Sequence, residues 1–147
     1  MKIKPSLMLI ATAISILLVA CATPAQPESR AWVEVSCDEF NDNHHINQTL
    51  EVQSGEIFEV KLCSSPTVGF RWLEEAQIDN AAVLKQEEHK YIGPDSEPPP
   101  PPEILWEEVW TFRALKHGSS RIYLELSEPW VGGKKGGWTF TLDVTVK

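Results

Sequence analysis

The chain has 147 residues, of which 21 are acidic and 13 basic, so its formal net charge is −8 at neutral pH. Binding to nucleic acid needs a basic surface that neutralises phosphates, so this composition excludes nucleic acid as an expected partner. The length fits a single domain with a hydrophobic core of its own.

The N-terminal segment has the layout of a secretory signal peptide, with a short basic head followed by the apolar run Leu7–Ala20. That run of about 14 residues is shorter than the roughly 20 residues of a transmembrane helix. It ends at Cys21 in a pattern similar to the lipobox of bacterial lipoproteins, in which the cysteine becomes the lipidated N-terminus. An ordinary signal peptide with a cysteine nearby is the alternative.

We therefore expect residues 1–20 to be a lipoprotein signal peptide and residues 21–30 to be a lipidated tether. The protein is then exported and lipid-anchored to the cell envelope through Cys21, facing the periplasm or the exterior.

Two cysteines remain once Cys21 is set aside, namely Cys37 and Cys63. An even pair in an oxidising compartment predicts a disulfide, and the alternative is two buried free thiols. No cysteine or histidine spacing is typical of a metal site, since the adjacent His44 and His45 would point to opposite faces of a strand. We expect neither a metal nor another cofactor.

Alternation of apolar and polar residues, which is typical of half-buried β-strands, recurs along the chain. The alternating segments are Val33–Val35, Leu50–Val52, Phe58–Leu62, Trp106–Leu115, Arg121–Ser127 and Trp138–Lys147. No amphipathic helix of convincing length appears, and Lys116–Ser119 is predicted to form a tight hairpin between two strands. Residues 31–147 are therefore expected to form an all-β domain, an immunoglobulin-like antiparallel β-sandwich of about 6–8 strands.

Three loops have an unusual composition, at residues 63–70, 93–102 and 127–137. The first contains Pro66 and Gly69, the second ends in a run of prolines, and the third joins Pro129-Trp130 to two pairs of glycines. Because connections alternate between the two ends of a sandwich, we expect the three loops to share one end.

The first and third loops carry two motifs, Ser65-Pro66-Thr67-Val68-Gly69-Phe70 and Glu128-Pro129-Trp130. In their spacing and strand context they resemble the chagasin family of cysteine-peptidase inhibitors. The loops of that family read Asn-Pro-Thr-Thr-Gly followed by an aromatic residue, and Arg-Pro-Trp. Ser65, Val68 and Glu128 depart from this pattern, and the second loop is rich in proline where the family more often has glycine.

The resemblance implies a reversible proteinaceous inhibitor of papain-like cysteine proteases, the cell's own or a host's, which blocks the active-site cleft with three loops. It implies that Thr67 lies nearest the catalytic cysteine and that Trp130 packs beside the cleft on the leaving-group side. The protease-binding residues expected from it are Ser65, Pro66, Thr67, Val68, Gly69, Phe70, Gly93, Trp106, Glu128, Pro129 and Trp130. Such an inhibitor is not an enzyme, and we expect it to be a monomer.

The alternative function is an immunoglobulin-like envelope lipoprotein module that binds another protein or a glycan, since one sandwich fold serves many functions. Trp130 would then simply cap the core. An enzymatic function has no support, because no nucleophile motif is present and paired carboxylates such as Glu107-Glu108 are expected to be solvated.

Overall fold

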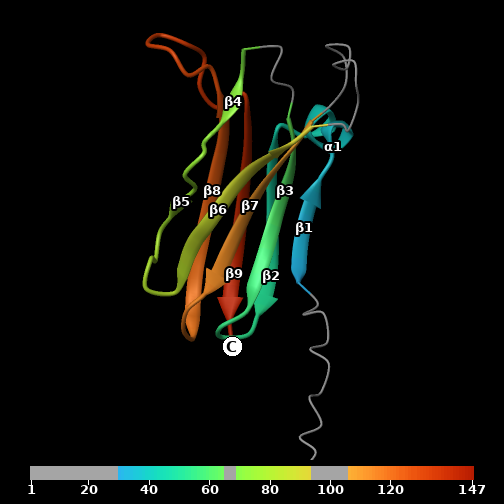
Figure 1. Cartoon of the computed structure of the whole chain (residues 1–147). Helices are drawn as coiled ribbons and strands as arrows, with labels where there is room; N and C mark the ends of the chain where they lie inside the picture. Colours follow the sequence, from blue (N-terminus) through green and yellow to red (C-terminus); the bar gives the residue numbers. More distant parts are fainter. Residues whose placement is uncertain (1–29, 65–68, 94–105) are drawn as a thin grey trace, which may run out of the picture.

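The computed structural model describes residues 30–64, 69–93 and 106–147, which form two packed β-sheets and one short helix (Figure 1). The first sheet has the strand order β1 (Ala31–Val35), β3 (Ile57–Ser64), β7 (Trp106–Ala114) and β6 (Leu84–Ile92). The second has the order β2 (His45–Val52), β9 (Trp138–Val146), β8 (Gly118–Ser127) and β4 (Arg71–Trp72), and β5 (Gln77–Ile78) also pairs with β8. The helix α1 (Cys37–Asp42) connects β1 to β2.

The predicted β-sandwich is confirmed, with nine strands in the described residues where about 6–8 were expected. Most neighbouring strands run antiparallel, but β1 pairs with β3 in parallel, and so does β2 with β9. For β1 and β3 the reason is that β2, which lies between them in the chain, belongs to the other sheet. Two strands of one sheet that are separated in the chain by one strand of the other sheet run in the same direction.

The prediction of a hairpin at Lys116–Ser119 is wrong. The strands on either side of this turn belong to different sheets, because β7 pairs with β3 and β6 whereas β8 pairs with β9, β4 and β5. The backbone N–H of Leu115 donates to the carbonyl of Val83, 2.8 Å away, so the connection is held from outside the turn. Alternation in the sequence shows which residues face inward, but it does not show which sheet a strand joins.

The core lies between the two sheets, and the strands contribute alternate residues to it as their sequence pattern predicts. Its buried side chains include Phe58, Val60, Leu62, Trp110, Phe112, Ala114, Ile122, Leu124, Phe140, Leu142 and Val144. The core cluster extends from Val33 to Val146, so this domain holds a complete hydrophobic core of its own.

One acidic residue is buried with these apolar side chains. The expectation that Glu107-Glu108 is solvated is wrong for Glu108, of which only 1 % is exposed. Glu108 lies on the same face of β7 as Trp110 and Phe112, so the alternation that buries those rings also buries the carboxylate.

The helix α1 was not expected from the sequence, because six residues are too few to show a helical period. Its start is a capping box: the Glu39 backbone N–H donates to the Ser36 hydroxyl, and the Ser36 backbone N–H donates to the Glu39 carboxylate. This second hydrogen bond is the main reason that the pKa of Glu39 is lowered. In the part of the chain that the structure describes, no helix has the length and apolar character needed to cross a membrane.

The described roots of the three loops lie at one end of the sandwich, as predicted, because they pair with one another. Ser64 at the end of β3 pairs with Trp106 at the start of β7, and Leu126 near the end of β8 pairs with Trp138 at the start of β9. The Trp72 indole N–H donates to the carbonyl of Cys63 at 2.9 Å and so ties the two sheets together at this end. We call it the loop end. The first strand begins at the opposite end of the sandwich (Figure 1).

The loop end is closed by the helix and by a covalent bond. The predicted disulfide between Cys37 and Cys63 is present, with a Cα–Cα distance of 5.2 Å. Phe40 of α1 is fully buried, and its ring stacks on Trp138 with the ring centroids 4.9 Å apart. The helix therefore covers the core at this end and is bonded to the strand that leads into the first loop.

We expect the double substitution Cys37→Ala/Cys63→Ala to lower the free energy of unfolding by roughly 3.5 kcal/mol, because the disulfide spans 26 residues of the unfolded chain. Urea unfolding of both proteins under oxidising conditions measures the difference. A reductant should bring the wild type to the midpoint of the variant and leave the variant unchanged. Equal midpoints without reductant would contradict the expectation.

Candidate functional site

The structure describes the residues on both sides of the first loop but not its centre. The predicted binding residues within the described part are Gly69, Phe70, Gly93, Trp106, Glu128, Pro129 and Trp130. Ser65, Pro66, Thr67 and Val68 lie outside the described residues, as does the predicted lipidation site Cys21.

The first and third loops meet where Trp130 packs against Gly69. A Cβ atom added to Gly69 would lie 3.3 Å from Cη2 of Trp130, so the indole ring occupies the space that a side chain would need. Gly69 has a φ of +83°, a conformation that glycine adopts without strain. Trp130 is 51 % exposed, and it therefore does not cap the core. Half of its surface remains free for a partner.

Phe70 has a different position from its neighbour Gly69. It is half-buried and packs against the core, and a Cβ atom added to Gly137 would lie 3.2 Å from its ring. Phe70 therefore joins the exit of the first loop to the chain that enters β9, and it acts as a support for the loop end.

The third loop is closed on itself by Glu128. The backbone N–H of Glu128 donates to the carbonyl of Lys134 at 2.8 Å, and the Lys134 N–H donates to the Glu128 carboxylate at 2.7 Å. The Lys135 ammonium donates to the backbone carbonyl of Glu128 at 2.5 Å. The sequence has Glu128 at the position where the chagasin family has arginine. Its carboxylate therefore holds its own loop together.

A second carboxylate, Glu125, fixes the root of this loop. It accepts hydrogen bonds from the hydroxyl of Ser127, from the Gly136 backbone N–H at 3.1 Å and from the hydroxyl of Tyr123 at 3.0 Å. The hydrogen bond from Ser127 is the main reason that the pKa of Glu125 is lowered, while burial raises the pKa of Tyr123. Glu125 is thus ionised at neutral pH, and it joins β8 to the end of the third loop at Gly136.

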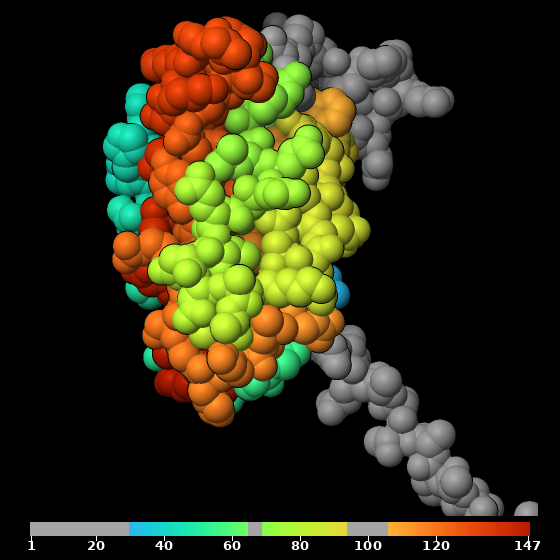
Figure 2. All heavy atoms as spheres, turned by 90° about the vertical axis from the view of Figure 1, so that its left-hand side faces the viewer, coloured from blue at the N-terminus to red at the C-terminus, as the bar shows by residue number. Residues whose placement is uncertain are grey.

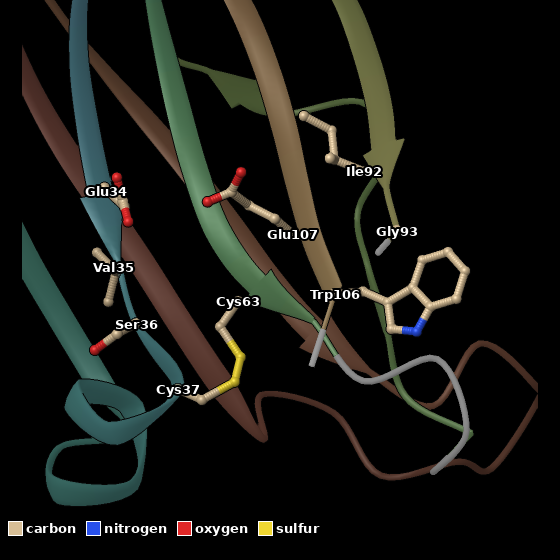
Figure 3. Close-up of a pocket in the computed structure, with 9 residues that line it drawn as sticks. All are labelled: Glu34, Val35, Ser36, Cys37, Cys63, Ile92, Gly93, Trp106 and Glu107. Atoms are coloured by element: carbon tan, nitrogen blue, oxygen red, sulfur yellow. A yellow bond between two sulfur atoms is a disulfide. The ribbon is translucent and has the colours of Figure 1, made fainter. Parts of the chain in front are cut away.

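The root of the second loop is a contact between Gly93 and Trp106. A Cβ atom added to Gly93 would lie 2.2 Å from Cζ3 of Trp106, so only glycine fits beneath the ring. The ring also makes an edge contact with Tyr91, with the centroids 6.2 Å apart. Beside this contact lies a hollow that includes the disulfide (Figure 3), lined by Glu34, Val35, Ser36, Cys37, Cys63, Ile92, Gly93, Trp106 and Glu107.

Exposed apolar side chains gather at the loop end. Among the described residues, four of the six large hydrophobic side chains that are exposed lie there: Tyr91, Ile92, Trp130 and Val131. Val131 is fully exposed, on the third loop that stands at the upper end of the molecule in Figure 2. Sequence reasoning did not select Val131, although an isolated valine in a segment of glycines and lysines was a detectable signal. Exposed apolar residues concentrated at one end indicate a surface for binding a protein.

The described residues do not suggest a metal centre. Across 30–64, 69–93 and 106–147, no three side chains of His, Cys, Asp or Glu gather in a way that could hold a metal ion.

We expect Gly69→Ala to disturb Trp130, because the new Cβ would crowd the indole ring at 3.3 Å. Gly55→Ala is the matched control, since Gly55 has a similar φ of +87° but nothing within 4 Å of the added Cβ. Both variants should lose roughly 1 kcal/mol of stability through backbone strain. Only Gly69→Ala should shift the fluorescence of Trp130, measured as the difference from the same protein carrying Trp130→Phe. A shift in Gly69→Ala no larger than that in Gly55→Ala would contradict the contact between Gly69 and Trp130.

The sequence was compared with known protein families and proteins. Residues 51–144 match the chagasin family of peptidase inhibitors, I42. Chagasin of Trypanosoma cruzi is 30 % identical over 104 residues, which cover 67 % of this chain and 88 % of chagasin.

Two solved structures have the same fold. The cysteine protease inhibitor EhICP2 from Entamoeba histolytica is 20 % identical with a TM-score of 0.58, and the match covers 83 % of this chain and all of EhICP2. The solution structure of amebosin is 21 % identical with a TM-score of 0.52, covering 80 % of this chain and 98 % of amebosin. The family match and the relationship to chagasin together show that this chain belongs to the chagasin family of peptidase inhibitors.

Proposed function

We propose that the protein is a reversible inhibitor of papain-like cysteine proteases that fills the active-site cleft with its three loops. Membership of a family of peptidase inhibitors supports this proposal, and EhICP2, which shares the fold, is a cysteine protease inhibitor. Membership of this family also disfavours both an enzymatic role and the alternative of an unrelated envelope module. The observation that carries the proposal is the position of Trp130, half exposed on a hydrogen-bonded loop and packed against the exit of the loop that contains Thr67.

The first loop would occupy the centre of the proposed binding surface. Residues 65–68 would lie over the catalytic cysteine of the protease, with Thr67 nearest to it, and the support for this is the motif from Ser65 to Phe70. Pro66 restricts its own φ and the conformation of Ser65, so the free loop has fewer conformations to lose on binding. Binding would then cost less conformational entropy, which favours tight association.

The third loop provides the apolar anchor. Trp130 is the kind of large aromatic residue that contributes most to interface affinity, and the adjacent Val131 extends the apolar surface. Because Glu128 is engaged with Lys134 inside the loop, its charge is partly satisfied before any partner arrives. The change from arginine to glutamate at this position would then alter the choice of protease and the rate of association more than the shape of the surface.

We expect Trp130→Ala to weaken the inhibition of a papain-like protease by roughly 30-fold, which corresponds to the loss of about 2 kcal/mol from a central aromatic anchor. The measurement is the inhibition constant of residues 22–147 against papain over a concentration series. Trp32→Ala is the matched control, because Trp32 is 63 % exposed on the strand that begins at the opposite end of the domain. Absence of inhibition by the wild type against papain and several relatives at micromolar concentration would refute the proposed function.

We also propose that the inhibitor is exported, lipidated on Cys21 and anchored to the cell envelope as a monomer, facing the periplasm or the exterior. The basic head, the apolar run Leu7–Ala20 and the small residues before Cys21 support this proposal. We expect the full chain, expressed in a bacterium, to incorporate an alkyne-labelled fatty acid and to sediment with membranes. Cys21→Ser should abolish both, and a labelled Cys21→Ser protein would show that another residue is modified.

A further inference from the structure

A carboxylate is buried directly beneath the loop end. Glu108 is 1 % exposed and Ser64 is fully buried, and both lie between the sheets at the end of the core. An ionised carboxylate in such a place is costly unless hydrogen bonds or opposite charges compensate for the lost water. The partners of Glu108 therefore indicate why it is tolerated.

Both oxygens of Glu108 are engaged. The Ser64 hydroxyl donates to Oε1 at 2.6 Å, and Nε2 of His89 lies 2.8 Å from Oε2. The Tyr91 hydroxyl is 3.4 Å from the Ser64 hydroxyl. The His89 ring stacks on Trp110 with its centroid 4.7 Å away, which fixes the direction of its nitrogen. We call Ser64, His89 and Glu108 the polar cluster, and Tyr91, which is 42 % exposed, lies at its edge.

The cluster connects the roots of two loops. Ser64 is the last residue of β3, and the first loop starts at the next position. Tyr91 and Glu108 face each other across β6 and β7, two residues from either end of the second loop as bounded by Gly93 and Trp106. One carboxylate thus holds the point from which the first loop leaves the sheet and the two strands that carry the second.

Stability alone does not account for a charged residue at this position. A buried ion pair replaced as a whole by apolar residues of similar size is often neutral or more stable, because the desolvation cost disappears. Apolar side chains make no directional hydrogen bonds. The two acceptor oxygens of the Glu108 carboxylate fix the orientations of the Ser64 hydroxyl and the His89 ring at the same time. Glu108 therefore contributes the orientation of these two side chains more than it contributes stability.

We propose that Glu108 and His89 are positioning residues of the inhibitor, which fix Ser64 and with it the orientation of the first loop towards the protease. The proposal deepens the proposed function and rests on it for the inhibition readout. The position of the loop roots is measurable without any protease.

The experiment compares three variants of residues 22–147. Glu108→Gln keeps an oxygen for Ser64 and gains an N–H for His89, so it should retain the positioning. Ser64→Ala/His89→Phe/Glu108→Leu replaces the cluster by apolar side chains and keeps an aromatic ring against Trp110. Thr111→Val is the matched control, because it removes a buried hydroxyl elsewhere on β7.

We expect the triple variant to keep its urea midpoint and to inhibit papain at least about tenfold more weakly, which corresponds to 1.4 kcal/mol of binding free energy. The amide NMR signals of Gly69 and Phe70, which follow the first loop, should shift or broaden in the triple variant. Glu108→Gln and Thr111→Val should show the wild-type signals and inhibition within about threefold of the wild type.

Three outcomes would overturn the proposal. One is a triple variant with the signals and inhibition of the wild type. Another is a loss of inhibition that follows a loss of stability in every variant, since that is the behaviour of a merely structural cluster. If the wild type does not inhibit papain, the proposed function fails, and unchanged Gly69 and Phe70 signals in the triple variant would then separately overturn the positioning role.

Discussion

The arrangement of the loop end depends on how firmly the last residues of β3 are held. Cys63 is bonded covalently to Cys37 at the start of α1, and its carbonyl accepts a hydrogen bond from Trp72 of the opposite sheet. The next residue, Ser64, is bound through its side chain to Glu108. The first loop therefore starts from a point that is fixed on three sides, by a helix, by the second sheet and by the neighbouring strand. A loop with a fixed origin loses less freedom when it binds, which is the property that a reversible inhibitor needs.

The same kind of contact, an aromatic ring packed on a glycine, occurs at the root or end of each of the three loops. Trp130 lies on Gly69, Trp106 lies on Gly93, and Phe70 lies on Gly137. Two of these contacts, Trp130 with Gly69 and Phe70 with Gly137, join the first loop to the third, so these two loops limit each other's movement. The absence of a Cβ atom lets the ring approach the backbone closely, and an apolar contact then forms without an additional strand. The described parts of the first and third loops therefore form one surface, and the contact of Trp106 with Gly93 closes the root of the second loop.

The strands and the shared loop end could be predicted from the sequence, because alternation such as Phe58, Val60 and Leu62 reports directly which residues face a core. The disulfide followed from the pairing of two cysteines. The turn at Lys116–Ser119 was misassigned, since inward-facing residues look the same whichever sheet they belong to. Glu108 was expected to be solvated, and the part that Glu128 plays inside its own loop was not predicted. Both roles depend on partners, Ser64 and Lys134, and the sequence does not show that these come within hydrogen-bonding distance. The centre of the first loop, from Ser65 to Val68, rests on its motif alone.

The first strand begins at the end of the sandwich away from the loops. With Cys21 held in a membrane as proposed, the domain itself would separate the loops from the lipid surface by about 33 Å, the length of a ten-residue strand such as β8. The ten residues from 21 to 30 could add at most about 35 Å when fully extended. The inhibitor would then be confined to a thin layer above the membrane, and its local concentration there would be the number of anchored molecules per membrane area divided by the thickness that the tether and domain allow. A protease would meet this layer on arrival at the cell surface.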